Sequence, residues 1–84
     1  MEFEQITQKM NELYKRKNSD YGNSFYKTLD EFGIVAALVR MEDKMNRLKN
    51  LYKNPSGAQV DESFNDTLMD LANYAVMTLK WNES

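Results

Sequence analysis

Apolar residues recur along this chain at spacings of three and four, the period of helices that bury one face. Near the start, Phe3, Ile6, Met10 and Leu13 follow this spacing with mainly polar residues between them. The pattern predicts an amphipathic helix over residues 3–17. Residues 18–24 are rich in turn formers and include a glycine that can take a positive φ, so they predict a loop.

A short helix is predicted next, with Ser24 as its N-terminal cap and Gly33 as its end. From residue 34 to about residue 53 a longer helix follows. Its apolar stripe consists of Ile34, Leu38, Met41, Met45, Leu48 and Tyr52, and Val35 and Val39 widen this stripe beyond one face. We therefore expect the long helix to make two contacts, one within the chain and one with a neighbouring chain.

The segment 54–57 must end the long helix, because its proline lacks a backbone donor and its glycine permits a turn. We expect a linker that continues to about Val60. Ser63 and Asp66 then resemble a capping box, which predicts a last helix that reaches about Trp81. The apolar stripe of this helix is Phe64, Leu68, Leu71, Ala75 and Leu79.

The chain length determines how much of the apolar surface of these helices a single chain can bury. With 84 residues, the chain forms one domain over residues 1–84, and a domain of this size buries only about 60% of its unfolded surface. The sequence has no cysteine and no histidine, so disulfides and the usual zinc sites are excluded. The expected fold class is therefore all-α, a small antiparallel helical bundle completed by homo-oligomerisation into a dimer or tetramer.

Charge and hydropathy limit the classes of partner that this chain can bind. The longest apolar run, residues 34–39, is too short to span a bilayer, and the first residues do not resemble a signal peptide. We expect a cytoplasmic protein, in the host cytoplasm if phage-encoded, with no membrane partner. A net charge of −2 argues against binding to a nucleic acid duplex. Residues 9–17 and 40–53 are nevertheless basic, which suits a small anion.

Two polar stripes follow the last two predicted helices. Spacings of three and four place the members of each stripe on one side of its helix. The first stripe is Arg40, Asp43, Lys44 and Arg47, and the second is Asp66, Asp70 and Asn73 with Tyr74 beside it. They could be a solvated face with surface ion pairs worth about 0–1 kcal/mol each. They could also form a seam in which cations meet phosphates while acid or amide groups read a base or ribose.

The segment around the first predicted loop has groups that suit a nucleotide. Aromatic rings can stack on a base, lysine supplies positive charge, and backbone donors after Ser24 suit an anion. The candidate residues are Tyr14, Lys17, Asp20, Tyr21, Gly22, Ser24 and Phe25. The alternative is an ordinary connection between helices whose aromatic residues fill the core.

Metal-dependent catalysis has weaker support in the sequence. Asp66 and Asp70 supply half of a carboxylate set, but Glu42 and Asp43 are consecutive and diverge by about 100° around a helix. Three basic residues beside Asp43 favour direct phosphate binding over Mg²⁺. Without histidine or cysteine, a serine or tyrosine also lacks an obvious activating base. We therefore expect no catalytic residues, no metal ligands and no cofactor, and binding in preference to catalysis.

Four strings together resemble the phage and bacterial "nucleotide modification associated domain" family. They are KNSDYGNSF at 17–25, EFGIVAALVRM at 31–41, DKMNRL at 43–48 and DTLMDLANYA at 66–75, and the resemblance covers residues from about 14 to 79. That family is distantly similar to all-α nucleotide pyrophosphohydrolases of the MazG type, whose helices carry ExxE and ExxD pairs. Here the first pair is missing, which argues against hydrolysis.

Small helical phage proteins of this general appearance also act as nucleotide sponges, which sequester signals of the bacterial CBASS defence. This resemblance implies non-enzymatic binding and sequestration of a cyclic dinucleotide such as cGAMP, in a pocket at the oligomer interface or within one chain. One alternative is a Mg²⁺-dependent nucleoside triphosphate pyrophosphohydrolase that uses Asp66, Asp70 and Asp43, or an accessory to phage nucleotide modification. A purely structural oligomerisation domain is the third possibility.

Overall fold

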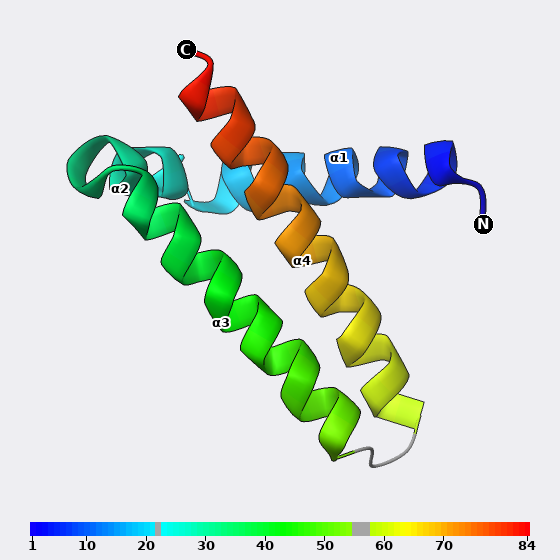
Figure 1. The fold of residues 1–84 in the computed structure, drawn as a ribbon. Coiled ribbons are helices and arrows are strands. Elements are labelled where there is room, and N and C mark those ends of the chain that lie inside the picture. The colour runs from blue at the N-terminus through cyan, green and yellow to red at the C-terminus, as the bar shows by residue number, and fades with distance from the viewer. Residues whose placement is uncertain (22, 55–57) are drawn as a thin grey trace.

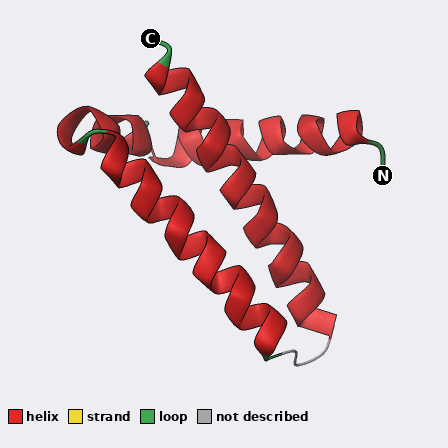
Figure 2. Cartoon of the chain, in the orientation of Figure 1, coloured by secondary structure: helices red, strands yellow, loops and turns green. Residues whose placement is uncertain are grey.

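The computed structural model describes residues 1–21, 23–54 and 58–84. Within these ranges the chain forms helices and no strand, which confirms the all-α prediction. The helices are α1 (Phe3–Tyr21), α2 (Ser24–Phe32), α3 (Ile34–Lys53) and α4 (Ala58–Asn82). α3 and α4 lie side by side as an antiparallel hairpin, and α1 crosses behind α4 (Figure 1). Figure 2 shows how little of the described chain lies outside helices.

α1 is longer than the apolar pattern predicts, because residues 18–21 continue the helix instead of forming a loop. The side-chain amide of Asn18 donates to Asn23 Oδ1 over 2.6 Å and so ties the last turn of α1 to the residue before α2. Asn23 has a φ of 63°, a left-handed conformation that asparagine tolerates better than most residues. Gly22, which the sequence analysis places in the turn, lies outside the described residues.

The joint between α2 and α3 is only partly as expected. Asn23 precedes α2 without a side-chain capping bond, and Ser24 is already helical, so the predicted serine cap is wrong. Gly33 does end α2, as predicted: its amide donates to Leu29 O over 2.8 Å. Its φ of 78° and ψ of −168° lie in a region that only glycine adopts readily. α3 starts at the next residue, so the chain turns a corner at Gly33 (Figure 1).

α4 begins at Ala58, five residues before Ser63, so the predicted linker to Val60 and the predicted cap at Ser63 are both wrong. Alanine and glutamine at positions 58 and 59 favour helix, which explains why the helix extends back beyond the capping motif. Ser63 lies inside the helix, where its carbonyl accepts a hydrogen bond from Thr67 Oγ1 over 2.7 Å.

The core is small and lies among α2, α3 and α4. Leu29, Ala37 and Leu48 are buried, and so are Thr67 and Thr78. Each threonine hydroxyl donates to the carbonyl four residues earlier, which satisfies a polar group inside a helix.

Two further features bear on the outside of the fold. The Trp81 indole donates to Asp30 Oδ1 over 2.9 Å and so joins the end of α4 to α2. Among the described residues, no helix is both long and apolar enough to cross a bilayer.

Candidate functional site

A pocket of about 300 Å³ opens where α1, α2 and α4 meet, with α3 at its edge. All four helices contribute to it, although its residues are spread along the sequence from Tyr14 to Met77. It is lined by Tyr14, Lys17, Asn18, Ser24, Phe25, Lys44, Asp70, Asn73, Tyr74 and Met77.

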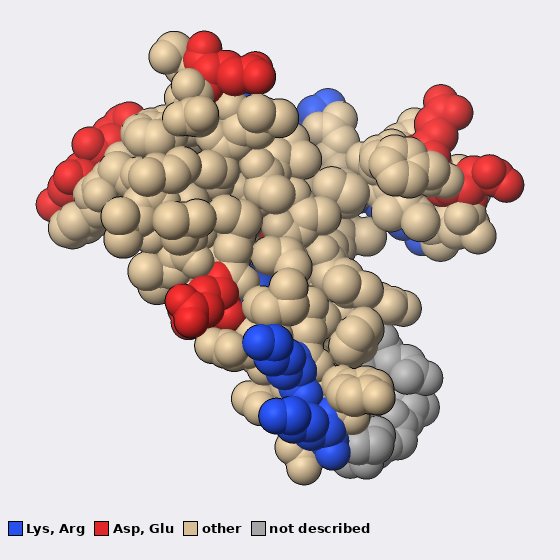
Figure 3. Space-filling view, viewed as in Figure 1, with Lys and Arg blue, Asp and Glu red and all other residues tan. Residues whose placement is uncertain are grey.

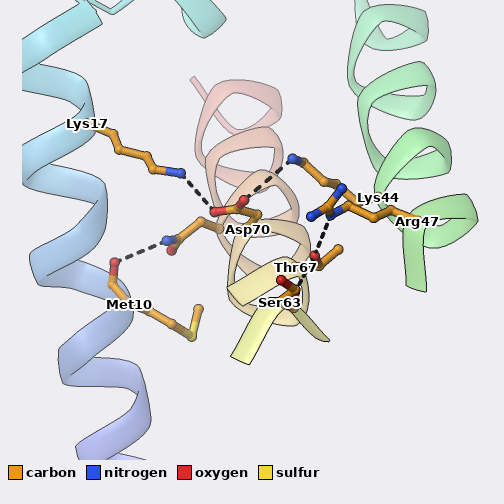
Figure 4. A network of polar contacts seen from close by, with 8 residues as sticks. Met10, Lys17, Lys44, Arg47, Ser63, Thr67 and Asp70 are labelled. Atoms are coloured by element: carbon orange, nitrogen blue, oxygen red, sulfur yellow. Dashed lines mark hydrogen bonds and ion pairs between the residues drawn. The ribbon is translucent and has the colours of Figure 1, made fainter. Parts of the chain in front are cut away.

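The charged wall of the pocket is built around Asp70 on α4. Lys17 Nζ on α1 lies 3.0 Å from Asp70 Oδ1, and Lys44 Nζ on α3 lies 3.5 Å from Asp70 Oδ2. Figure 4 shows the two lysines approaching the carboxylate from opposite sides. Both oxygens of Asp70 therefore have a cationic partner, and the three side chains together carry a net positive charge.

Exposure decides what these lysines can still bind. The Lys17 side chain is 50% exposed and that of Lys44 is 29% exposed. An ammonium group has three N–H donors, so a contact with Asp70 leaves each lysine with donors for a second acceptor. The wall can therefore accept an anion from the pocket side without losing its internal pairs.

Two neighbouring contacts hold the helices in place around this wall. The Asn73 amide on α4 donates to Met10 O on α1 over 3.2 Å, which fixes the crossing of these helices (Figure 4). On the other side, Arg47 Nε on α3 donates to Thr67 Oγ1 over 3.1 Å. Asn73 and Arg47 therefore have structural contacts on either side of Asp70.

The opposite wall is aromatic. The rings of Phe25 and Tyr74 meet edge to face with their centroids 4.9 Å apart, an arrangement that stabilises aromatic pairs. Behind them, the hydroxyls of Tyr14 and Tyr26 lie 3.0 Å apart. Burial raises the pKa of Tyr26 well above its ordinary value, and the hydrogen bond with Tyr14 adds to this rise. Tyr26 therefore stays protonated near neutral pH.

A second pocket of about 320 Å³ adjoins the first and is lined by residues of α1, α2 and α4. The two share Tyr14, Asn73 and Met77. The second is mainly apolar, with Met10 and Val76 in its walls, and Lys80 lies over the Tyr26 ring at 5.1 Å from the ring centroid.

Much of the site expected from the sequence is brought together in the first pocket. Its lining includes predicted residues from both polar stripes and from the α1–α2 segment, namely Tyr14, Lys17, Ser24, Phe25, Lys44, Asp70, Asn73 and Tyr74. Other expected residues are exposed and do not line it: Asp20, Arg40, Asp43 and Asp66. Arg47 contacts Thr67 instead. Gly22 and the side chain of Tyr21 lie outside the described part of the structure.

Two lining residues were not expected from the sequence. Asn18 was assigned to a loop, although it lies in the last turn of α1, one residue after Lys17. Met77 lies off the apolar stripe of α4, on the same side as Asp70 and Asn73. A helical reading of residues 18–21 and the spacing 70–73–77 would have found both.

The described acidic residues are not arranged as a metal site. In the parts of the chain that the structure describes, no three aspartate or glutamate side chains cluster as metal ligands. Asp70 faces the pocket, but two ammonium groups occupy its oxygens. What the arrangement offers is charge and aromatic surface for binding an anion with a ring system.

Comparison with known proteins gives one match. Neither the curated proteins nor the solved structures include one that matches this chain. The model of the family described as "Nucleotide modification associated domain 1" matches residues 17–80, which include the pocket residues from α2, α3 and α4 and Lys17 and Asn18 of α1. Because this match spans most of the chain, the protein belongs to the Nucleotide modification associated domain 1 family.

Proposed function

We propose that this domain binds a nucleotide in the first pocket without covalent chemistry. Its phosphate lies against Lys17 and Lys44, and its base lies against the Phe25–Tyr74 wall. The observation that carries this proposal is the convergence of lysines from two separate helices beside an aromatic pair. A volume of about 300 Å³ is at the small end for ligand pockets, which suits one nucleotide unit.

The bound nucleotide is held and not cleaved. Hydrolysis of a phosphoanhydride by a metal-dependent route needs carboxylates free to bind the metal. Asp70 is instead paired with two lysines, and Asp66, one turn earlier on α4, is exposed and outside the pocket lining. The same lysines suit a phosphate in its ground state, so binding without turnover is the better match to this chemistry.

The finer form of the proposal is a ligand with two bases. The second pocket adjoins the first through Tyr14, Asn73 and Met77, and its apolar walls suit a second base. A cyclic dinucleotide would place one base in each pocket and a phosphate at the lysines. On this proposal the domain sequesters such a signal, as a phage sponge against CBASS defence would.

The decisive experiment identifies the bound molecule. Purified protein is incubated with a mixture of nucleoside mono- and triphosphates and cyclic dinucleotides, freed of unbound ligand, denatured and analysed by mass spectrometry. We expect one intact nucleotide to be released. Release of a cleaved product would support the pyrophosphohydrolase alternative. Release of nothing would overturn the proposal and leave a structural domain.

A pair of α1 variants then places the ligand. Lys17→Gln removes a pocket charge, whereas Lys15→Gln removes the same charge two residues away, on the other side of the helix. We expect Lys17→Gln to weaken binding of the identified nucleotide about tenfold, as loss of a charge-assisted hydrogen bond does, and Lys15→Gln to leave it unchanged. Equal effects of both variants would mean that the ligand lies elsewhere.

A further inference from the structure

The α3–α4 hairpin carries an apolar face that nothing in the described chain covers. On α3, Ile34, Leu38, Met45 and Tyr52 recur at intervals of four and seven, and their exposed fractions range from 41% to 80%. Met41 and Leu48 complete the alternating four–three spacing of helices that pack against a partner helix. Leu48 is buried within the chain, so the four exposed residues form the outer edge of this stripe. On α4, the same spacing recurs in Leu68, Ala72, Ala75 and Leu79, of which the two leucines are 43% and 57% exposed.

The two stripes lie on the same side of the hairpin, away from the pocket. At about 100° per residue, Leu68 and Leu79 lie about 160° and 180° around α4 from Asp70. Asp70 and Lys44 mark the side of the hairpin on which α1 crosses, because Lys17 of α1 reaches the same carboxylate. On α3, the stripe lies about 80–120° around the helix from Lys44, in one direction. Arg47 lies about 60° from Lys44 in the other direction, so the stripe and Arg47 flank the α3–α4 contact on opposite sides. The stripes therefore form one continuous surface.

Figure 3 views the molecule from this side, with α1 behind the hairpin. Uncharged atoms cover α4 and the region between the two helices, whereas an acidic group and a run of basic groups lie along α3, and further acidic groups lie toward the ends of the molecule. An apolar centre with a charged rim is the usual composition of a protein interface.

The exposed area also points to a missing partner. A folded monomer of 9.9 kDa is expected to expose about 5,200 Å². This chain exposes 6498 Å². The excess is more than the roughly 800 Å² that each partner contributes to a standard interface. Few hydrophobic side chains are buried in return, with Leu29, Ala37 and Leu48 forming the described apolar core.

We propose that a second copy of this chain covers the face, so that two α3–α4 hairpins pack into a four-helix bundle with twofold symmetry. A twofold interface must complement itself, and an uncharged apolar centre does so because no like charges meet across the axis. The pockets then lie on the two outer sides of the dimer, each built from one chain and open to solvent.

The first test is the mass of the protein in solution. Sedimentation equilibrium of the full chain should give twice the mass of 9.9 kDa, and the midpoint of thermal unfolding should rise with protein concentration, as it does for a dimer. A monomer whose unfolding midpoint does not depend on concentration would overturn the proposal.

Two adjacent residues then locate the interface. Leu38 lies on the face and is 56% exposed, whereas Val39 is 50% exposed but lies about 100° around α3. Leu38→Glu should give a monomer and Val39→Glu a dimer, with helical content checked by circular dichroism. A dimer in both variants would place the interface elsewhere and overturn the proposal.

Cysteine labelling keeps the test decisive if Leu38→Glu fails to fold. The chain has no cysteine of its own, so Leu38→Cys and Val39→Cys each introduce a single thiol. In the wild-type assembly the thiol at position 38 should react with a maleimide at least tenfold more slowly than the thiol at position 39. Equal rates would mean that no second chain covers Leu38.

Discussion

At the residue scale, the role of Asp70 distinguishes a site that only binds a nucleotide from a site that hydrolyses one. Its carboxylate lies between two lysines and repels any phosphate that they attract. Asp70→Asn removes this charge with little change of shape, so we expect nucleotide affinity to rise about fivefold. That is the effect of about 1 kcal/mol, the size of one charge interaction at about 4 Å in water. Isothermal titration calorimetry at low salt measures it.

Asp66→Asn is the matched control for this substitution. Asp66 lies one turn before Asp70 on α4, is exposed and does not line the pocket, so its loss should leave affinity unchanged. If α4 instead held a metal for hydrolysis, both substitutions would reduce binding in the presence of Mg²⁺. That outcome would contradict the reading of Asp70 as the partner of two lysines.

The raised pKa of Tyr26 predicts how the stability of the fold depends on pH. Its pKa in the folded chain lies above the ordinary value of 10.0, chiefly because of burial and also because of its hydrogen bond with Tyr14. Above pH 10 the unfolded chain therefore loses this proton first. The stability that Tyr26 contributes is complete below pH 10 and is lost as pH rises toward the folded pKa.

Urea unfolding of wild-type protein and Tyr26→Phe between pH 8 and 11 checks this prediction, since phenylalanine has no proton to lose. We expect the wild type to lose stability above pH 10 more steeply than the variant. Parallel curves for the two proteins would show that Tyr26 titrates normally in the folded chain.

At the element scale, Gly33 permits the corner between α2 and α3. Its φ of 78° and ψ of −168° are costly for any residue with a Cβ, although no atom lies within 4 Å of where the Cβ would be. We expect Gly33→Ala to reduce the free energy of unfolding by about 1–3 kcal/mol, entirely through backbone strain. Urea unfolding at one fixed protein concentration measures this.

Val35→Ala serves as the comparison for Gly33→Ala. It removes apolar atoms from a residue that is 61% exposed, two positions into α3. A change within about 0.5 kcal/mol is expected there. If both substitutions had equally small effects, the corner would not depend on glycine.

The helices also show which features of an element a sequence can predict. α3 was predicted with both of its bounds, because Gly33 and the motif at 54–57 leave the chain few alternatives. α1 and α4 were predicted too short, at residues 18–21 and 58–62. In both places polar turn formers or a capping motif predicted the boundary of a helix, whereas the chain stays helical through them.

At the scale of the whole molecule, the sequence predicted the kinds of side chain that line the pocket but not which individual residues come together there. Lys17 and Asp70 were both expected to contact a ligand, yet nothing in their spacing of fifty-three residues indicates that they form an ion pair. That contact depends on the angle at which α1 crosses α4. For the same reason Arg40 was expected beside Lys44 in the site, but does not line the pocket.

Ligand binding should be visible in the stability of the whole domain. A nucleotide at about 100 times its Kd adds about 2.7 kcal/mol to the free energy of unfolding. For a domain of this size that corresponds to a rise of about 10–20 °C in Tm. Differential scanning calorimetry measures the shift. No shift with any nucleotide of the panel would contradict the proposed function.

High salt provides an internal check on this shift. At about 1 M salt the screening length is only about 3 Å, and Lys17 is half exposed. The shift should therefore shrink markedly at high salt if phosphate contacts carry the binding. A shift that did not depend on salt would instead point to binding through the aromatic wall alone.

The N-terminal turns of α1 extend past the hairpin (Figure 1), and the contacts that join the helix to α4 lie further along, at Met10 and Lys17. Turns of a helix that are held by few contacts open locally more easily than the hairpin, so the amides of α1 should exchange with solvent deuterium faster than those of α3. An anion held between Lys17 and Lys44 would link α1 to α3 and slow that exchange. Deuterium uptake by α1 would then report occupancy of the pocket, even for a ligand without a spectroscopic signal.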